Sequence, residues 1–313
     1  MFNIRYALTA ALLCGWSSVN AQELDPRSYL NLPINQNFAA VVYGRVEGDL
    51  YLSPDSAVDD LKLDIDSVAV AYARTFELFG NSSKFDMSVG RGCVDGSARF
   101  QGPDGSEING APVNNGDKIY RDWCGYTDTK MRLNYNFYGA KAMEMKDYVK
   151  QPKGIVVGSS IQVSIPTADY DSDYVLNLGG NRWWVKPEIG ASFPIGRWEW
   201  DIAVSAKIFG DNDELQNQFT LEQDPIYNIQ SHLIYDIAPG QWIALNGNYF
   251  FGGDTFIDGA RSSNKEGNYR AGFTYSYALN SQHSIKFLAN MGVTTRRGND
   301  TDVYALAYAY RWE

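Results

Sequence analysis

The chain has 313 residues, enough for one large or two ordinary domains, and carries 27 lysines and arginines against 37 aspartates and glutamates, a formal net charge of −10. This acidic balance argues against a nucleic-acid partner, because phosphate backbones are bound by clusters of basic side chains. The mean hydropathy is −0.33 and no run of about 18 apolar residues occurs, which excludes a transmembrane helix but not strands, in which only every second residue is apolar.

Residues 1–21 have the three parts of a secretory signal peptide. Arg5 supplies the positive charge, residues 7–13 form the apolar run, and Val19-Asn20-Ala21 is an A-x-A-like cleavage site before Gln22. A short buried helix is the alternative for this segment. The pattern predicts an exported chain whose mature form begins with a polar lead-in, residues 22–36.

After removal of this segment the chain retains two cysteines, Cys93 and Cys124. Two cysteines in an exported chain predict one disulfide. Closing a loop of about 30 residues would stabilise the fold by roughly 3–4 kcal/mol in the chain-entropy model. The segment 93–124 is rich in glycine and proline, so we expect a long irregular loop that either caps the barrel mouth, folds into its lumen, or is simply solvated.

Residues 177–209 contain the clearest secondary-structure signal. Two segments alternate apolar and polar residues with a period of 2, which indicates two β-strands, and Pro194-Ile195-Gly196 between them has turn chemistry. The apolar faces carry Trp183, Val185, Ile189, Trp198, Trp200, Ile202 and Val204. The polar faces carry Arg182, Trp184, Lys186, Glu188, Glu199, Asp201 and Lys207.

The same alternation recurs about a dozen times, with aromatic residues at the ends of the apolar faces. The expected strands are 37–50, 63–79, 84–92, 126–138, 154–165, the two halves of 177–209, 224–237, 241–251, 269–277, 285–291 and 304–312. Short turns on one side and long loops on the other are typical of an all-β transmembrane antiparallel up-and-down β-barrel over residues 37–313. Ten or fourteen strands remain alternatives to twelve, and a soluble β-sandwich is the alternative class.

The last strand, 304–312, ends in Trp312 and resembles the signal by which bacterial outer-membrane barrels are recognised for assembly. Glu313 leaves the aromatic residue penultimate rather than last. The expected partners are therefore outer-membrane lipid, the barrel-assembly machinery and a small-molecule solute, and the expected location is the bacterial outer membrane.

Four pieces between Gly158 and the C-terminus carry a family resemblance. They are GSSIQVSIPTADYDSDYVLNLGGNRWWVKPEIGASFPIGRWEWD, KIFGDNDE, QDPIYNIQSHLIYDIAPGQWIALNGNYFFGGDT and MGVTTRRGNDTDVYALAYAYRW. Together they cover about half of the chain and are similar to the family of the MetA-pathway of phenol degradation. The resemblance implies an outer-membrane barrel for the passage of small, often aromatic or hydrophobic, compounds, and it brings no catalytic or binding residues to carry over.

The lumen is the expected functional site. Its candidate residues are Arg182, Trp184, Lys186, Glu188, Glu199, Asp201, His232 and Trp242, and we also expect Arg45 and Glu47 to face inward. These charges either form a salt-bridge lattice that satisfies buried groups, or line a conduit that orients a solute. Trp184 and Trp242 either stack on an aromatic solute or merely fill the lumen.

Catalysis is the rival class, since some outer-membrane barrels are lipases or proteases. We do not predict an enzyme, because a Ser–His pair would be needed and only His232 and His283 are available, with no G-x-S-x-G elbow. No cofactor or metal is expected. The acidic loops at Asp171, Asp173 and 211–214 lack a full calcium-loop pattern, so solvated loops are expected there rather than calcium sites. A barrel that displays its loops, like an adhesin, is the remaining alternative.

Overall fold

The computed structural model describes residues 26–51, 58–101, 104–108, 111–172, 177–215, 217, 219–261, 265–295 and 298–313. The predicted signal peptide lies outside these residues. No helix in the described part of the chain is long and apolar enough to cross a membrane. One four-residue helix is described, α2 (Met145–Tyr148), and strands make up almost all of the remaining structure.

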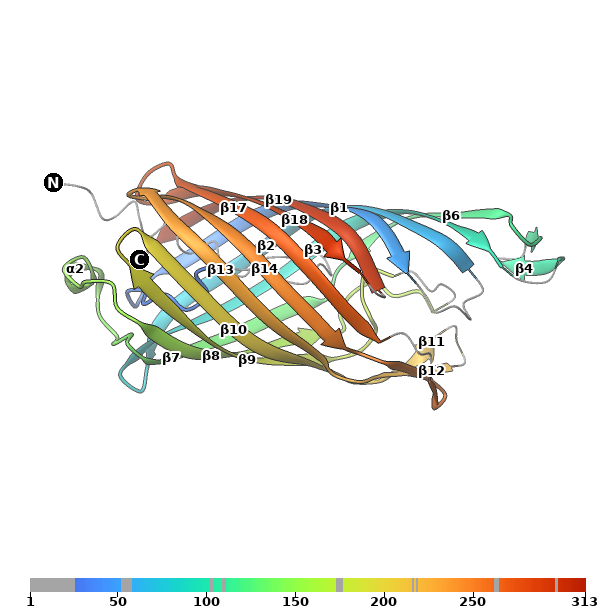
Figure 1. Cartoon of the computed structure of the whole chain (residues 1–313), viewed down its shortest axis with the longest axis horizontal. Helices are drawn as coiled ribbons and strands as arrows, with labels where there is room; N and C mark the ends of the chain where they lie inside the picture. The colour runs from blue at the N-terminus through green and yellow to red at the C-terminus, as the bar shows by residue number, and fades with distance from the viewer. Residues whose placement is uncertain are drawn as a thin grey trace.

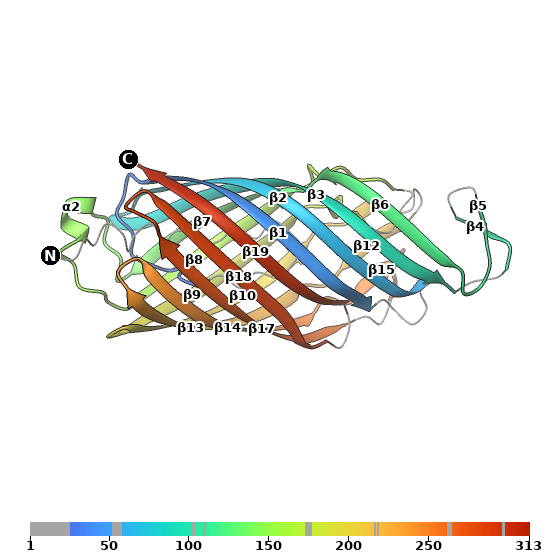
Figure 2. The same ribbon diagram turned by 90° about the horizontal axis from the view of Figure 1, so that it is seen from above.

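The strands form a closed antiparallel barrel (Figures 1 and 2). In order around the ring they are β1 (Asn37–Tyr51), β2 (Val58–Leu78), β3 (Asn81–Phe100), β6 (Lys118–Tyr126) with β7 (Thr129–Tyr138), β8 (Val156–Ile165), β9 (Trp184–Ile195), β10 (Trp198–Phe209), β13 (Ile226–Ala238), β14 (Gln241–Gly252), β17 (Glu266–Ala278), β18 (His283–Thr294) and β19 (Gly298–Trp312). Within the described ranges the sheet has thirteen strands, and β6 and β7 share one edge of β3, so the ring has twelve positions. The pairing of β1 with β19 and of β2 with β3 leaves no gap, and this confirms the predicted twelve-stranded barrel.

The alternation of residue types determines which side of the wall each side chain occupies. On β10, Trp198 and Trp200 are 49% and 45% exposed on the outside, whereas Glu199 and Asp201 between them are 1% and 4% exposed on the inside. The outer face is apolar with aromatic residues toward both ends, as a lipid-facing band requires. The chain is therefore a transmembrane β-barrel of the outer-membrane type.

The two ends of the barrel differ. The C-terminus, the start of β1 and α2 lie at one end and the longer loops lie at the other (Figure 1). Tight turns at the first end place Gly196 and Gly240 at φ values of 63° and 77°, in the left-handed region that glycine adopts readily. In outer-membrane barrels the short-turn end is periplasmic and the long-loop end is extracellular.

The described residues between the two cysteines mostly form strands, so the prediction of an irregular loop at 93–124 was wrong for them. β3 continues to Phe100 and pairs with β6, and β4 (Ser106–Ile108) pairs with β5 (Ala111–Val113) at the tip, beyond the barrel mouth (Figures 1 and 2). The alternation of inward and outward residues continues beyond the glycines of β3, because Val94, Ala98 and Phe100 are all buried on its inner side. We call residues 93–124 the β3–β6 extension.

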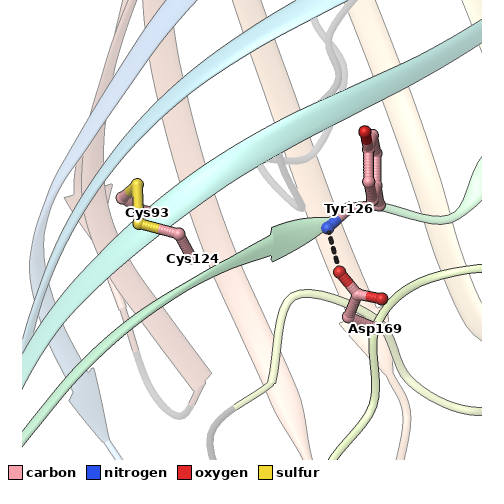
Figure 3. Close-up of a disulfide and its surroundings, with 4 residues drawn as sticks. All are labelled: Cys93, Cys124, Tyr126 and Asp169. Carbon is pink, nitrogen blue, oxygen red and sulfur yellow. Dashed lines mark hydrogen bonds between the residues drawn. A yellow bond between two sulfur atoms is a disulfide. The ribbon is translucent and has the colours of Figure 1, made fainter.

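The predicted disulfide is confirmed. Cys93 and Cys124 lie directly opposite each other on β3 and β6, with their sulfurs bonded at 2.04 Å (Figure 3). A hydrogen bond of 2.8 Å from the backbone N–H of Tyr126 to the carboxylate of Asp169 then ties the end of β6 to the long loop between β8 and β9 (Figure 3). The disulfide and this hydrogen bond hold the base of the extension on two sides.

A second small sheet lies at the extracellular end. It consists of β11 (Asn212–Leu215), β12 (Phe219–Gln223), β15 (Thr255–Ile257) and β16 (Ala260–Arg261). These strands come from two consecutive extracellular loops, so the loops support each other across the ends of β10, β13 and β14.

The expectation that Arg45 and Glu47 face inward was wrong. Val42 and Val46 are buried on the inner side of β1, whereas Arg45 is on the outside and forms a 2.8 Å ion pair with Asp66. On β1 the inward residues are therefore apolar and the charged residues face outward, which is the reverse of what a polar lumen predicts. Above the lipid-facing band the outer face instead carries a row of carboxylates in cross-strand register: Asp302, Glu47, Asp64, Asp95 and Asp122.

Candidate functional site: the barrel lumen

The predicted lead-in is folded into the lumen rather than extended outside it. The described part, residues 26–36, contacts the inner wall at the periplasmic end, and Arg27, Tyr29, Leu32 and Gln36 are all buried. We call residues 26–36 the N-terminal segment. Nothing in the local sequence pattern predicts this position, because the segment has no period of its own.

Arg27 attaches the N-terminal segment to the polar side of the lumen. Its guanidinium lies 3.2 Å from the Glu199 carboxylate and 2.5 Å from that of Asp236, and 4.9 Å from the centre of the Trp242 ring. Its backbone N–H donates to Asp201 at 2.7 Å. Burial alone lowers the pKa of Arg27, but the attraction of Glu199 and Asp236 outweighs it and raises the pKa, so the guanidinium stays charged.

Tyr29 occupies a space left by two glycines. Its hydroxyl donates to Glu188 at 2.8 Å, and Gln230 donates to the other oxygen of the same carboxylate at 3.1 Å. A Cβ at Gly190 would lie 2.3 Å from the Tyr29 ring, and one at Gly158 would lie 2.7 Å from it. These two positions on β8 and β9 therefore have room for the tyrosine ring because they carry no side chain.

The long periplasmic turn closes over the N-terminal segment from below. The Ile34 N–H donates to the Met143 carbonyl at 2.9 Å, and Met145 and Tyr148 of α2 pack with Leu32 against the inner wall. The periplasmic end of the lumen is thus filled by two parts of the chain that are more than a hundred residues apart in sequence.

One side of the inner wall is mostly apolar along its length. The inward side chains of β19, β1, β2 and the extracellular half of β3 are mainly aliphatic or aromatic: Val303, Ala307, Ala309, Phe38, Ala40, Val42, Val46, Leu63, Ala69, Ala71, Ala73, Val94, Ala98 and Phe100. The polar exceptions on this face are Ser67, Thr75, Thr301 and Arg311. We call this surface the apolar wall. Leu32 covers its periplasmic end, and Leu178 and Trp123 cover its extracellular end.

The opposite side, which we call the polar wall, is made by β7 to β18. Its inward side chains include Arg132, Asn134, Gln162, Glu188, Gln230, His232, Asn246, Asn248, Arg270, Thr274, Lys286 and Asn290. Some form a direct lattice, as where His232 and Asn246 meet at 2.9 Å and Asn246 donates to Thr274 at 2.9 Å. The side-chain amide of Asn134 and Oδ1 of Asn290 are buried without a protein partner, and such atoms take their hydrogen bonds from ordered water.

The predicted lumen residues separate into two groups. Glu199, Asp201 and Trp242 meet at the periplasmic end, where they contact Arg27. Arg182, Trp184 and Lys186 lie in the extracellular half, where Lys186 approaches Glu188 at 4.0 Å on its own strand. Sequence reasoning missed Arg27 and Tyr29 at the periplasmic end and Phe209, which is opposite Trp184, at the extracellular end.

Among the described residues, no group of three or more His, Cys, Asp or Glu side chains is arranged to hold a metal ion. His283 lies outside the lumen, at the periplasmic rim, where its ring nitrogen is 2.5 Å from the Tyr308 hydroxyl. The lumen is thus a surface of contacts and charges, and its two walls are its main chemical feature.

Residues 54–308 match the sequence model of the family described as the MetA-pathway of phenol degradation. The chain belongs to this family. The match covers more than half of the chain and confirms the resemblance drawn from the sequence. No curated protein matches the sequence significantly.

Solved structures with the same architecture are distant in sequence. An outer membrane channel from Pseudomonas putida F1 is 20% identical, with 93% of this chain and 100% of that chain covered and a TM-score of 0.68. The transport unit of the autotransporter AIDA-I from Escherichia coli is 9% identical, with coverage of 98% and 96% and a TM-score of 0.51. At these identities the likeness confirms the outer-membrane barrel fold, and the fold in turn points to the bacterial outer membrane as the location.

Proposed function

We propose that this protein is an outer-membrane channel for small aromatic or hydrophobic compounds. The apolar wall is the single observation that carries the proposal. A water-filled diffusion channel has a polar interior, whereas here β19, β1, β2 and β3 present a mostly apolar surface opposite a polar one. The name of the family and the channel from Pseudomonas putida F1 support the same reading.

The affinity of the apolar wall for a small solute is low enough for passage rather than retention. Burying apolar surface gains roughly 25 cal/mol per Å². A small aromatic solute that buries about 50 Å² against the wall would gain only about 1 kcal/mol, which enriches it several-fold in the lumen and still allows rapid release. The polar wall keeps the rest of the lumen hydrated, so a solute with one polar group fits both sides.

The N-terminal segment limits this passage at the periplasmic end. Leu32 packs on the apolar wall and Arg27 on the polar wall, so the segment crosses the lumen from one wall to the other. A solute that follows the apolar wall reaches the periplasm when the segment moves aside. The contacts of Leu32 and Arg27 with the two walls therefore determine how often the lumen is open to the periplasm.

The test is uptake by proteoliposomes that contain the refolded mature chain. Phenol should enter at least several times faster than a sugar alcohol of similar size. Val42 and Ala307 are register partners on the apolar wall, so Val42→Asn with Ala307→Asn should abolish this preference, while Val42→Ala should keep it. Equal rates for the two solutes through the wild-type protein would refute the proposal.

Surface display is the second candidate, and the β3–β6 extension favours it. This disulfide-braced hairpin projects beyond the barrel mouth, where another molecule could contact it (Figures 1 and 2). A folded barrel that passes neither ions nor phenol would favour display over transport.

We also propose that β19 is the strand recognised by the barrel-assembly machinery. Tyr310 and Trp312 stack at 5.7 Å at its periplasmic end, on the outer side of the barrel. Replacing Trp312 with Ala should reduce the amount of folded protein in the outer membrane without changing the heat stability of the fraction that folds.

A further inference from the structure

Positive charge gathers around two aromatic rings in the extracellular half of the lumen. The ammonium of Lys207 lies 4.3 Å from the centre of the Trp184 ring and 5.1 Å from that of Phe209, and the Lys130 ammonium is 6.0 Å from the Trp184 ring. The guanidinium of Arg182 lies 4.5 Å from the centre of the Phe209 ring. We call these five residues the Trp184 cluster.

Strand register brings the cluster together. Lys130 on β7 is opposite Ser164 on β8, Ser164 is opposite Trp184 on β9, and Trp184 is opposite Phe209 on β10, so they form one inward row. Arg182 is two residues before Trp184. The next row toward the periplasm adds Arg132 and Lys186, which flank Gln162 of β8.

Cations and carboxylates share this part of the lumen. Five described cations face it: Lys130, Arg132, Arg182, Lys186 and Lys207. The carboxylates beside them include Glu188, 4.0 Å from Lys186, Asp86, opposite Arg132 on β3, and Asp128, which accepts a backbone N–H. Glu188 also binds Tyr29 and Gln230.

Arg182 is a cation of this group that has no described carboxylate partner. Its Nη2 donates to the neutral side-chain oxygen of Gln223, its Nη1 is buried without a hydrogen-bond partner, and no described carboxylate lies within ion-pair distance of it. Burial lowers the pKa of Arg182 to about 10, because the more distant charge of Asp211 offsets the loss of hydration only in part. A largely buried guanidinium without an anion is costly, and an incoming anion would remove that cost.

We propose that the Trp184 cluster is a binding subsite for aromatic carboxylates, of which benzoate is the simplest. The ring of the ligand would pack on the Trp184 indole, and its carboxylate would meet Lys207 and Arg182. The proposal deepens the proposed channel function and rests on it for its biological meaning: the subsite holds an anionic aromatic solute in the outer half of the lumen, on the side opposite the apolar wall.

The chemistry makes the subsite selective in three ways. A neutral ring such as benzyl alcohol keeps the stacking contact but loses the charge contact. Acetate keeps the charge and loses the ring, and benzylammonium is repelled by the cations. Each loss should weaken binding by about tenfold or more, since one charge-assisted contact or one stacked ring is typically worth that much.

The experiment is calorimetric titration of the full mature chain, folded in detergent, with benzoate, benzyl alcohol, acetate and benzylammonium. Benzoate should bind about tenfold more tightly than benzyl alcohol or acetate, and the preference over benzyl alcohol should shrink in high salt. Trp184→Leu and Lys207→Gln should each weaken benzoate binding by about tenfold. Trp183→Leu is the matched control, because Trp183 is adjacent in sequence but faces outward, and it should leave binding unchanged.

Folding of each variant is checked by the heat-modifiable mobility typical of barrels. If Trp184→Leu does not fold, Lys207→Gln and Lys207→Arg test the subsite instead. The arginine variant should retain benzoate binding and the glutamine variant should lose it. Equal binding of benzoate and benzyl alcohol, or wild-type affinity in folded Lys207→Gln, would overturn the subsite.

Uptake by proteoliposomes separates the subsite from the channel function. Passage of phenol without a preference for benzoate binding would refute the subsite alone. Selective benzoate binding without passage of phenol or benzoate would refute the channel and leave the subsite standing.

Discussion

Replacing Arg27 with Ala should release the N-terminal segment from the lumen while the barrel stays intact. The guanidinium is the point at which the segment meets Glu199 and Asp236, and neither carboxylate belongs to the segment itself. The twelve-stranded ring does not depend on residues 26–36 for its closure, since all of its strand pairs lie between Asn37 and Trp312.

The magnitude follows from what the substitution leaves behind. Removing one partner of a buried ion pair costs about 3–5 kcal/mol. Asp236 keeps a second cation, because Lys153 lies 2.5 Å from it, but Glu199 has a side chain only 2% exposed and keeps only a longer contact to Lys153 at 3.8 Å. We therefore expect the low end, about 3 kcal/mol, which raises the ratio of released to docked segment about 100-fold.

Single-channel recording in planar bilayers measures this ratio. Arg27→Ala should spend much more time in a high-conductance state than the wild type. Lys153→Ala is the control: its side chain is 54% exposed, so its ion pairs are worth less than about 1 kcal/mol and the open fraction should change only a few-fold. If Arg27→Ala and Lys153→Ala behave alike in folded protein, the docked segment does not control conduction and the reasoning fails.

Three further outcomes are expected. Replacing Cys93 and Cys124 with Ser should leave the barrel folded on unboiled gels but make the β3–β6 extension susceptible to limited trypsin digestion. The reason is that the disulfide contributes about 3–4 kcal/mol to the stability of this extension. Equal digestion rates of the variant and the wild type would count against this. Gly190→Val should displace the Tyr29 ring and raise conductance, because even a Cβ would lie 2.3 Å from it. Unchanged conductance would contradict the prediction that the position of this ring limits conduction. Burial raises the pKa of Tyr148 from 10.0 to about 12, so the packing of Tyr148 is fully stabilising below pH 10 and is lost as the pH rises through 12. Conductance should rise over this range, because Tyr148 packs beside Leu32 of the N-terminal segment. Conductance that stays constant from pH 9 to pH 12 would contradict this.

The amino-acid sequence by itself determined most of the barrel wall. A period of 2 assigns each residue of a strand to one of two faces, so Trp184, Glu199 and Trp242 share a face with polar residues, and the expectation of a polar lumen places them inward. Turn residues such as Gly196 and Gly240 then mark where the chain reverses. These features depend on residues close together in the chain, and a single sequence contains that information.

Local pattern failed where the inner wall is apolar or where glycines interrupt the alternation. On β1 the pattern alone cannot say whether Val42 or Arg45 faces the lumen, because a wall that is apolar inside and charged outside has the same period as its reverse. On β3 the glycines at positions 92 and 96 hid a strand that continues to Phe100. The phase and the length of these strands were decided by pairing with their neighbours.

Only the tertiary structure could place the N-terminal segment and assemble the lumen contacts. Arg27 meets Asp236 across 209 positions of the chain, and the rings of Trp184 and Phe209 share one row only in the observed register. Such contacts exist because closing the ring confines every inward side chain to one narrow space, where buried charges must find partners. The pattern of each strand determines which way its residues point, and the closure of the barrel decides what they meet.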